Sequence, residues 1–256
     1  MGNHNKLSDL CIILVVRLDT IERLENILFV TKYLTTLLTT SVTVVESYSY
    51  NNGLLVNLLD KKIQYVFHED HDPILFRTKL LNEILEKAKT SFVSIWDTDV
   101  IVPTSQIVKA IELLRNREAD FVYPYEKYFL DTSPILRKMF LRNPEIEFLE
   151  QNIKKMKEMY PPNPLGGAFL ANLKSYKESG LENESFYGWG MEDGERFYRW
   201  ENMGYKIKRV PGPLFHLSHP RGQNSNFHDV DQHFLKKKEV ISVKRNRLFK
   251  ENALGQ

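Results

Sequence analysis

Short apolar runs alternate along the chain with segments whose apolar residues recur every three or four positions. Five of the runs predict strands: residues 10–16, 41–46, 63–66, 92–96 and 121–123. The run at 10–16 is typical of a strand buried on both faces, and the run at 92–96 also predicts a buried strand. Three segments are typical of amphipathic helices: one that opens at Asp19 or Thr20, one over residues 75–88 and one over residues 107–114. Strands that alternate with helices predict an α/β fold with a mostly parallel central sheet flanked by helices.

Polar side chains lie at the carboxyl ends of several predicted strands. Arg17 follows the first strand, Glu46 ends the second, and Asp97 and Asp99 follow the fourth. Ligands of such sheets bind beyond the carboxyl ends of the strands, so we expect these side chains to converge on a binding site. Arg17 and Arg77 are candidate anion binders, and the alternative is that they are surface or salt-bridged arginines.

The pattern changes over residues 128–160, which are rich in charged residues, Phe, Leu and Met and predict helices or a lid. Pro161, Pro162 and Pro164 break this segment. Beyond the prolines the chain becomes rich in aromatic residues and glycine.

The composition narrows the function classes. The chain has 256 residues, with 35 Lys and Arg against 33 Asp and Glu and a net charge of +2, which argues against a protein that mainly coats nucleic acid. Hydrophobic residues at 42% suffice for a core and exclude a mainly disordered chain. A single cysteine excludes an intramolecular disulfide and a cysteine-based zinc cluster, and it fits a reducing compartment. No apolar run reaches the roughly 20 residues that span a bilayer, so we expect neither a signal peptide nor a transmembrane segment.

Asp97 and Asp99 form a candidate metal site. Two carboxylates two residues apart, directly after a buried strand, repel each other and lose hydration, and a divalent cation relieves both costs. Hard oxygen ligands suit Mg²⁺ or Mn²⁺, which commonly bridge carboxylates to a diphosphate. The alternative is an aspartate turn in which both groups are solvated.

His216 and His219 form a second candidate pair. Residues three apart in a strand point to opposite faces, so both imidazoles reach one ion only if the chain turns between them. Gly212, Pro213 and Pro220 favour such a turn. Imidazole together with carboxylate suits Mn²⁺ better than Mg²⁺. The alternative is a pair of partly buried loop histidines.

The stretch GWGMED is the most distinctive in the chain. Gly188 and Gly190 allow the backbone to approach a ligand closely and leave the indole of Trp189 free to pack on a sugar ring. Glu192 and Asp193 could bind hydroxyl groups, and one of them could remove a proton as general base. The alternative is a purely structural role: a buried Trp in a glycine turn, followed by a helix with acidic residues in its first turn. Both interpretations can hold together.

Several motifs, in one order, resemble the β-1,4-galactosyltransferase type of GT-A glycosyltransferase. They are IILVVR at residues 12–17, RTKLLN at 77–82, WDTD at 96–99, LGGAFL at 165–170, GWGMED at 188–193 and HLSH at 216–219. The resemblance covers about residues 10–125 and 163–235. Pro164 stands where family members carry a residue that helps to choose the sugar, which leaves the donor sugar open.

The resemblance implies a GT-A (nucleotide-diphospho-sugar transferase) fold in one catalytic domain over residues 1–256, in a soluble, bacterial-style relative. We expect four parts: a nucleotide-binding half at about 10–125, a helical insertion at about 126–162, an acceptor- and metal-binding half at about 163–235 and a basic tail at 236–256.

The resemblance also implies an activity. The protein would be a metal-dependent, inverting glycosyltransferase that moves a hexose or N-acetylhexosamine from a UDP-sugar to a saccharide acceptor hydroxyl, in polysaccharide or glycan biosynthesis. Two rivals are a sugar-nucleotidyltransferase and a non-catalytic UDP-sugar-binding relative. The first is disfavoured because residues 16–19 lack the glycine of a phosphate-binding loop.

Residue roles follow from the same resemblance. The ligands of Mn²⁺ (or Mg²⁺) would be Asp99, His216 and His219. The residues that bind the nucleotide-sugar would be Arg17, Glu46, Arg77, Trp96, Asp97 and Trp189. The residues that bind the acceptor would be Tyr187, Trp189, Gly190, Glu192 and Asp193. Asp193 would be the catalytic base, with Glu192 beside it on the acceptor hydroxyls.

The basic tail has lysine and arginine clusters at residues 236–238 and 244–247. Such clusters predict contact with anionic lipid, which would suit a lipid-linked acceptor, and the alternative is a solvated helix face. We therefore expect a cytoplasmic protein with peripheral contact at the inner membrane face and no nucleic-acid partner.

Overall fold

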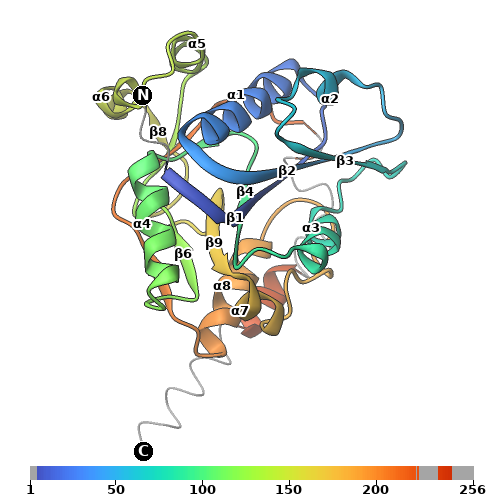
Figure 1. Cartoon of the computed structure of the whole chain (residues 1–256), viewed down its shortest axis with the longest axis vertical. Helices are drawn as coiled ribbons and strands as arrows, with labels where there is room; N and C mark the ends of the chain where they lie inside the picture. Colours follow the sequence, from blue (N-terminus) through green and yellow to red (C-terminus); the bar gives the residue numbers. More distant parts are fainter. Residues whose placement is uncertain (1–4, 223, 225–235, 244–256) are drawn as a thin grey trace, which may run out of the picture.

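A seven-stranded sheet forms the centre of the protein in a computed structural model, which describes residues 5–222, 224 and 236–243. Its strands, in spatial order, are β10 (Ile207–Arg209), β6 (Phe121–Tyr123), β9 (Ala168–Asn172), β4 (Phe92–Trp96), β1 (Asn5–Val16), β2 (Leu38–Tyr48) and β3 (Gln64–Glu69). Figure 1 shows these strands running through the middle of the molecule. The sheet is mostly parallel, as predicted, because only β9 runs antiparallel to both of its neighbours.

A second sheet, which the sequence pattern did not predict, has four short strands. In spatial order they are β5 (Val100–Ile101), β11 (Leu214–His216), β7 (Phe129–Asp131) and β8 (Lys157–Glu158). Strands of two or three residues are too short to show a periodic pattern, and they form here by pairing with distant parts of the chain.

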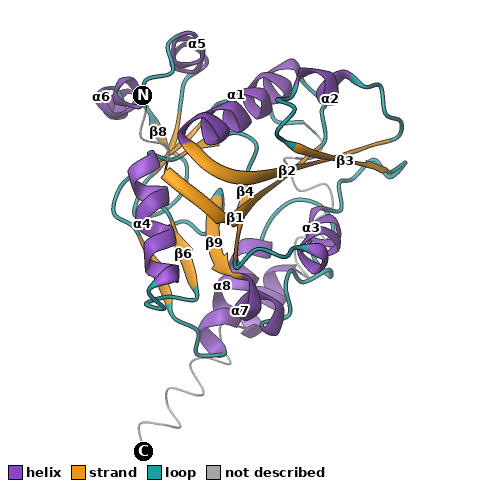
Figure 2. Cartoon of the chain, viewed as in Figure 1, coloured by secondary structure: helices purple, strands orange, loops and turns teal. Residues whose placement is uncertain are grey.

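Helices cover the strands on several sides (Figure 2). The helices are α1 (Ile21–Leu37), α2 (Leu54–Leu58), α3 (Arg77–Lys87), α4 (Thr104–Arg115), α5 (Pro134–Arg142), α6 (Ile146–Gln151), α7 (Leu173–Glu178) and α8 (Glu192–Asn202), with a 3-10 turn at Ile153–Lys155. Residues 236–243 are helical as well. Helix α1 packs along β2, α3 packs against β1, and α4 packs against β6 and β9. The Thr20 hydroxyl caps α1 by accepting from the Arg23 backbone N–H, as the sequence predicted.

Burial of strands β1 and β4 follows from their sequences. Every residue of β4 is buried, and so are residues 12–16 of β1, which lie between β2 and β4. Burial on both faces requires apolar residues at successive positions, which is the pattern seen in the sequence. Because β1 and β4 are parallel neighbours, Arg17, Asp97 and Asp99, which follow their carboxyl ends, lie at the same edge of the sheet.

The predicted helical insertion at residues 126–162 is more than helical. It contains α5 and α6, which project together at one end of the molecule in Figure 1, but it also contributes β7 and β8 to the second sheet. Since β7 pairs with β11, this segment supports the strand that ends at His216. Among the described residues, no helix combines the length and the apolar character needed to cross a bilayer.

Candidate active site

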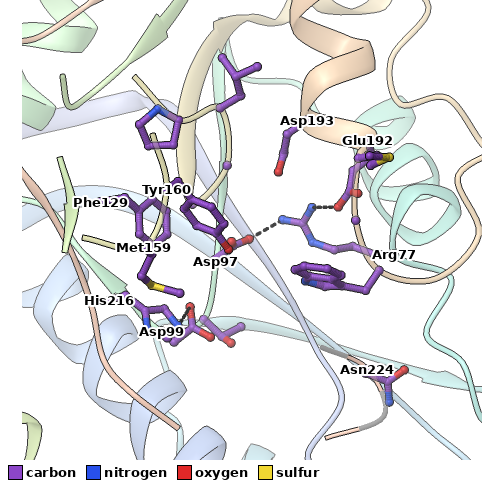
Figure 3. A pocket seen from close by; sticks show the side chains of 18 of the residues that line it. Arg77, Asp97, Asp99, Phe129, Met159, Tyr160, Glu192, Asp193, His216 and Asn224 are labelled. Atoms are coloured by element: carbon purple, nitrogen blue, oxygen red, sulfur yellow. Dashed lines mark hydrogen bonds and ion pairs between the residues drawn. The ribbon is translucent and has the colours of Figure 1, made fainter. Parts of the chain in front are cut away.

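A cavity of about 630 Å³ opens at the carboxyl ends of β1 and β4. Helix α8 and the segment 159–167 form further walls. The cavity gathers most of the polar residues predicted for the site: Arg17, Arg77, Asp97, Asp99, Glu192, Asp193, His216 and His219. Figure 3 shows Asp99 and His216 on one side and Glu192 and Asp193, from α8, on the other.

Asp99, His216 and His219 form a compact group whose potential ligand atoms all lie within 4.8 Å of one another. Asp99 Oδ2 lies 3.0 Å from His219 Nε2, and Asp99 Oδ1 lies 3.8 Å from His216 Nε2. The second sheet builds this arrangement, because β11 pairs antiparallel with β5 and sets His216 opposite Val100. The strand ends at His216, and the chain then turns, which brings His219 to the same point as the sequence required.

Asp131, at the end of β7, contacts the same histidine and was missed by the sequence analysis. Its Oδ1 lies 2.8 Å from His216 Nδ1. Because a carboxylate only accepts, Nδ1 carries the proton and Nε2 is left to face Asp99. In the same way His219 Nδ1 donates to the Pro220 carbonyl at 2.8 Å, which leaves its Nε2 for Asp99. Second partners of this kind orient metal-binding histidines.

The charges of this group complement one another. Burial raises the pKa of Asp99, but His216 and His219 outweigh burial and hold the pKa well below its usual range. Burial lowers the pKa of His216, but Asp99 and Asp131 outweigh it and raise that pKa. A buried carboxylate beside two imidazole nitrogens is a donor set that suits Mn²⁺. The residues present therefore fit the ion that the sequence predicted.

Arg77 links the two sides of the cavity. Its Nη2 donates to Asp97 Oδ1 at 2.7 Å, and its Nη1 lies 3.8 Å from Glu192 Oε1 (Figure 3). Glu192 Oε2 is buried and has no hydrogen-bond partner in the described part of the chain. Burial and the neighbouring Asp193 raise the pKa of Glu192 to about 7, against the lowering effect of Arg77. Glu192 is therefore partly protonated at neutral pH, and a protonated carboxyl can donate a hydrogen bond.

A sharp backbone turn presents Glu192 and Asp193 to the cavity. Gly188, Gly190 and Met191 have φ angles of 74°, 98° and 72°, in the left-handed region that favours glycine. Met191 adopts this conformation directly before α8 begins. The turn sets both carboxylates on the first turn of α8, where the positive end of the helix dipole stabilises them.

Trp189 and Gly190 also line the cavity, as predicted. The guanidinium of Arg221 lies 5.9 Å from the centre of the Trp189 ring. Lys236 Nζ donates to the Trp189 carbonyl at 3.3 Å and to the Tyr187 carbonyl at 2.5 Å. Lys236 is buried, so this member of the predicted basic tail supports the loop that carries Trp189 rather than facing solvent or lipid. Residues 244–256 of that tail lie outside the described residues.

Three predicted donor- or acceptor-binding residues do not line the cavity. Trp96 is buried and donates to the Val100 carbonyl at 3.1 Å, because every residue of β4 faces the interior. Glu46 is buried and accepts a 2.6 Å hydrogen bond from the Tyr65 hydroxyl. Tyr187 points its hydroxyl to Asp72, at 2.6 Å. These three side chains therefore lie outside the lining of the cavity that gathers the other predicted site residues.

Arg17 lines the cavity, but its guanidinium already has partners. It donates to the Ser47 carbonyl and hydroxyl, to the Asp72 carbonyl at 2.6 Å and to Asp70 Oδ2 at 2.6 Å. Arg17 therefore ties the end of β1 to the segment that follows β3. A smaller neighbouring cavity of about 350 Å³ shares Arg17 and Asn224 with the first.

Residues that the sequence analysis did not single out complete the walls. They are Arg23, Phe129, Met159, Tyr160, Tyr198 and Arg221. Phe129, Met159 and Tyr160 come from the segment 126–162, so this segment forms part of the site. No local motif marked these residues, because they come from separate parts of the chain that only the fold brings together.

Comparisons with known proteins show what the chain is similar to. A family model described as the N-terminal domain of galactosyltransferase matches residues 149–221, which include the segment that leads to α8 and the histidine pair. A search of curated proteins found no match. The match confirms the galactosyltransferase resemblance expected from the motifs.

Solved structures confirm the fold. The catalytic domain of Drosophila β-1,4-galactosyltransferase 7 with xylobiose is 17% identical, with a TM-score of 0.53 over 92% of this chain and 80% of that chain. A mutant of the same enzyme, in complex with manganese, UDP-Gal and xylobiose, is 16% identical with a TM-score of 0.53, over 89% of this chain and 79% of that chain. A mannosyltransferase from Pyrobaculum calidifontis, with GDP-Man and Mn²⁺, is 16% identical with a TM-score of 0.52, over 84% of this chain and 58% of that chain. The chain therefore has the GT-A glycosyltransferase fold that the sequence predicted.

Proposed function

We propose that the protein is a metal-dependent, inverting glycosyltransferase that transfers a hexose or N-acetylhexosamine from a UDP-sugar to a saccharide acceptor hydroxyl, in polysaccharide or glycan biosynthesis. One observation carries the proposal: a group fit to hold Mn²⁺ (Asp99, His216 and His219) and a helix-borne carboxylate, Asp193, line the same cavity. Both groups assist transfer of a sugar from a nucleotide, because charge develops on the departing diphosphate while the acceptor loses a proton.

The donor side of the site would use the two neighbouring cavities, which share Arg17 and Asn224. We place the nucleoside in the smaller cavity and the diphosphate near Arg17 and Arg77. Asp99, His216 and His219 would hold Mn²⁺, which when bound supplies positive charge that stabilises the departing UDP. Arg77, fixed by Asp97, adds a second positive charge at the centre of the cavity.

The acceptor side would use α8 and the aromatic wall. The indole of Trp189 and the ring of Tyr160 can pack on the apolar faces of sugar rings. Glu192, through its buried and unpartnered oxygen, would hydrogen-bond an acceptor hydroxyl. Asp193 would take the proton of the attacking hydroxyl as general base. Holding both sugars in this cavity supplies the alignment that the reaction needs.

Calorimetric titration tests the proposal. UDP-glucose, UDP-galactose, their N-acetyl forms and GDP-mannose are each titrated into the protein with Mn²⁺ and with a chelator. We expect one UDP-sugar to bind in a Mn²⁺-dependent manner, and Asp99→Ala or His219→Ala to weaken that binding. The control is His68→Ala, because His68 lies on β3 and does not line either cavity.

Three other outcomes would contradict the metal site or favour one of the two rival functions. UDP affinity that is equal with Mn²⁺ and with chelator would contradict the metal site. Release of pyrophosphate from a nucleoside triphosphate would favour a sugar-nucleotidyltransferase. Mn²⁺-dependent binding without transfer to any member of an acceptor panel would favour a non-catalytic relative.

A further inference from the structure

Arg196 forms a buried ion-pair network one helical turn after Asp193. Its side chain is 2% exposed. Nη1 donates to both oxygens of Glu182, at 2.9 and 2.7 Å, and Nη2 donates to Asp193 Oδ1. The arginine therefore bridges the carboxylate that lines the cavity and a second carboxylate that does not.

Glu182 is the fixed end of this bridge. Its side chain is 1% exposed and accepts a further hydrogen bond from the Tyr176 hydroxyl. The guanidinium carbon of Arg196 also lies 4.4 Å from the centre of the Phe169 ring, on β9. An arginine held by a buried carboxylate and an aromatic face has little freedom to move. Asp193 thus meets a rigid partner, although its own side chain is 33% exposed.

The two carboxylate oxygens of Asp193 lie in different surroundings. Oδ1 accepts from Arg196. Oδ2 lies beside Gly166, where a Cβ atom would come within 2.7 Å of it, and Gly166 itself lines the cavity. The geometry leaves Oδ2 as the oxygen that can meet an acceptor hydroxyl.

The contact also distinguishes Asp193 from its neighbour Glu192. Both carboxylates line the cavity, and each could in principle accept a proton. Only Asp193 has a hydrogen bond to a cation, because residues three apart share a helix face and Arg196 lies at that spacing. In the part of the chain that the structure describes, the nearest cation to Glu192 is Arg77, whose Nη1 lies 3.8 Å from Glu192 Oε1. The Arg196 hydrogen bond therefore fixes the orientation of the Asp193 carboxylate.

We propose that Arg196, held by Glu182, is a positioning residue that orients Asp193 and thereby makes Asp193 rather than Glu192 the proton acceptor. The inference rests on the proposed function. In the transfer step, the acceptor O–H proton moves to Asp193 Oδ2. The electron pair of the acceptor oxygen forms the new bond to the anomeric carbon, and the bond from that carbon to UDP breaks with its pair leaving on UDP.

The test compares three variants. Arg196→Lys keeps a cation for Glu182 but lacks the planar fork that holds two carboxylates at once. Arg196→Met removes the cation altogether. Arg199→Met is the matched control, because Arg199 lies on the same helix and pairs with Glu195 and two carbonyls but does not contact Asp193. Steady-state kinetics and thermal unfolding are measured for each, and crystal structures are determined for the wild type and Arg196→Lys.

We expect Arg196→Lys to lower kcat roughly 10- to 100-fold, as a misplaced catalytic group does, with KM for the UDP-sugar unchanged. Arg199→Met should keep kcat even where it lowers Tm. The crystal structure of Arg196→Lys should show the Asp193 carboxylate turned away from Gly166. Equal loss of kcat in the Arg196 and Arg199 variants, in proportion to lost stability, would overturn the proposal because the role would be structural only.

The crystal structures keep this inference separate from the proposed function. If the wild type transfers no sugar from any donor, the proposed function fails, and the orientation of Asp193 still decides the role of Arg196. Asp193 displaced in Arg196→Lys supports the positioning role. An Asp193 carboxylate that stays beside Gly166 in Arg196→Lys overturns it, whether or not the wild type is active.

Discussion

Replacement of Glu192 by glutamine should make the stability of the protein less dependent on pH. The Glu192 residue is 8% exposed, and its Oε2 has no hydrogen-bond partner in the described residues. Burial and Asp193 raise its pKa from 4.5 to about 7, despite Arg77. In the unfolded chain the pKa returns to its ordinary value, about 4.3.

The sign and the size of the effect follow from these two values. Between about pH 4.5 and pH 7 the native protein keeps the proton on Glu192 while the unfolded chain has lost it, so stability falls as pH rises. The contribution is fully present below the unfolded pKa and is lost as pH rises through the folded pKa. At about 1.4 kcal/mol per tenfold change, the total is about 4 kcal/mol, of which about 3 kcal/mol is lost above pH 5. Glutamine resembles the protonated acid and does not ionise, so the variant lacks this loss.

The assay is urea unfolding of metal-free, nucleotide-free protein from pH 5 to pH 8.5. Between pH 5 and pH 8.5 the variant should gain about 3 kcal/mol in stability relative to the wild type, which corresponds to a Tm change of roughly 6–12 °C. Glu201→Gln is the control, because Glu201 lies on the same helix but does not line the cavity. A stability difference that does not change with pH, or a glutamine variant that is less stable at pH 8.5, would refute the reasoning.

Three further substitutions test the rest of the site. Asp193→Asn should keep Mn²⁺ and UDP binding but lower the transfer rate by a factor on the order of 100 or more, since a general base is lost; near wild-type transfer would exclude the role. Asp131→Asn should weaken Mn²⁺ binding, followed by electron paramagnetic resonance, roughly 10- to 100-fold because His216 loses its charged partner; unchanged affinity would exclude that role. Gly166→Ala should lower kcat with little change in Tm, since the new Cβ would lie 2.7 Å from Asp193 Oδ2, whereas Gly194→Ala meets only an ordinary contact at 3.5 Å.

The large sheet could be predicted because its strands carry their own signal. Burial on both faces requires a run of apolar residues, and the runs at 92–96 and 121–123 coincide with β4 and β6. Strand β1 begins at Asn5, earlier than predicted. The prediction missed its first residues because Lys6, Ser8 and Asp9 interrupt the apolar pattern there. The second sheet carried no signal, since strands of two or three residues have no measurable period and exist through pairing across the chain.

The site residues that could be predicted are likewise those that lie in local sequence motifs. Asp99, His216, His219 and Asp193 lie in motifs that are visible in the sequence, and the structure brings them to one cavity. Asp131 is 85 residues from the histidine that it contacts, so no local pattern reveals the pair. Trp96 was predicted at the donor because it adjoins Asp97, but the backbone of β4 turns its side chain into the core.

The buried partner of Asp193, Arg196, could not be predicted from the sequence either. Arg196 lies three residues from Asp193, a spacing that is visible in the sequence. Its importance depends on Glu182, which is 14 residues away and becomes a partner only when the loop before α8 folds back. Sequence motifs therefore revealed the candidate metal ligands and the candidate base, and only the fold revealed the residues that orient them.

The most direct test of the central claim is the anomeric configuration of the product, read by proton NMR. The protein is incubated with the UDP-sugar that binds, an acceptor panel and Mn²⁺, and a parallel reaction contains chelator. The account predicts a β-glycoside from the α-linked donor, formed only with Mn²⁺ and lost in Asp193→Asn. An α-glycoside, or equal product in chelator, would contradict it.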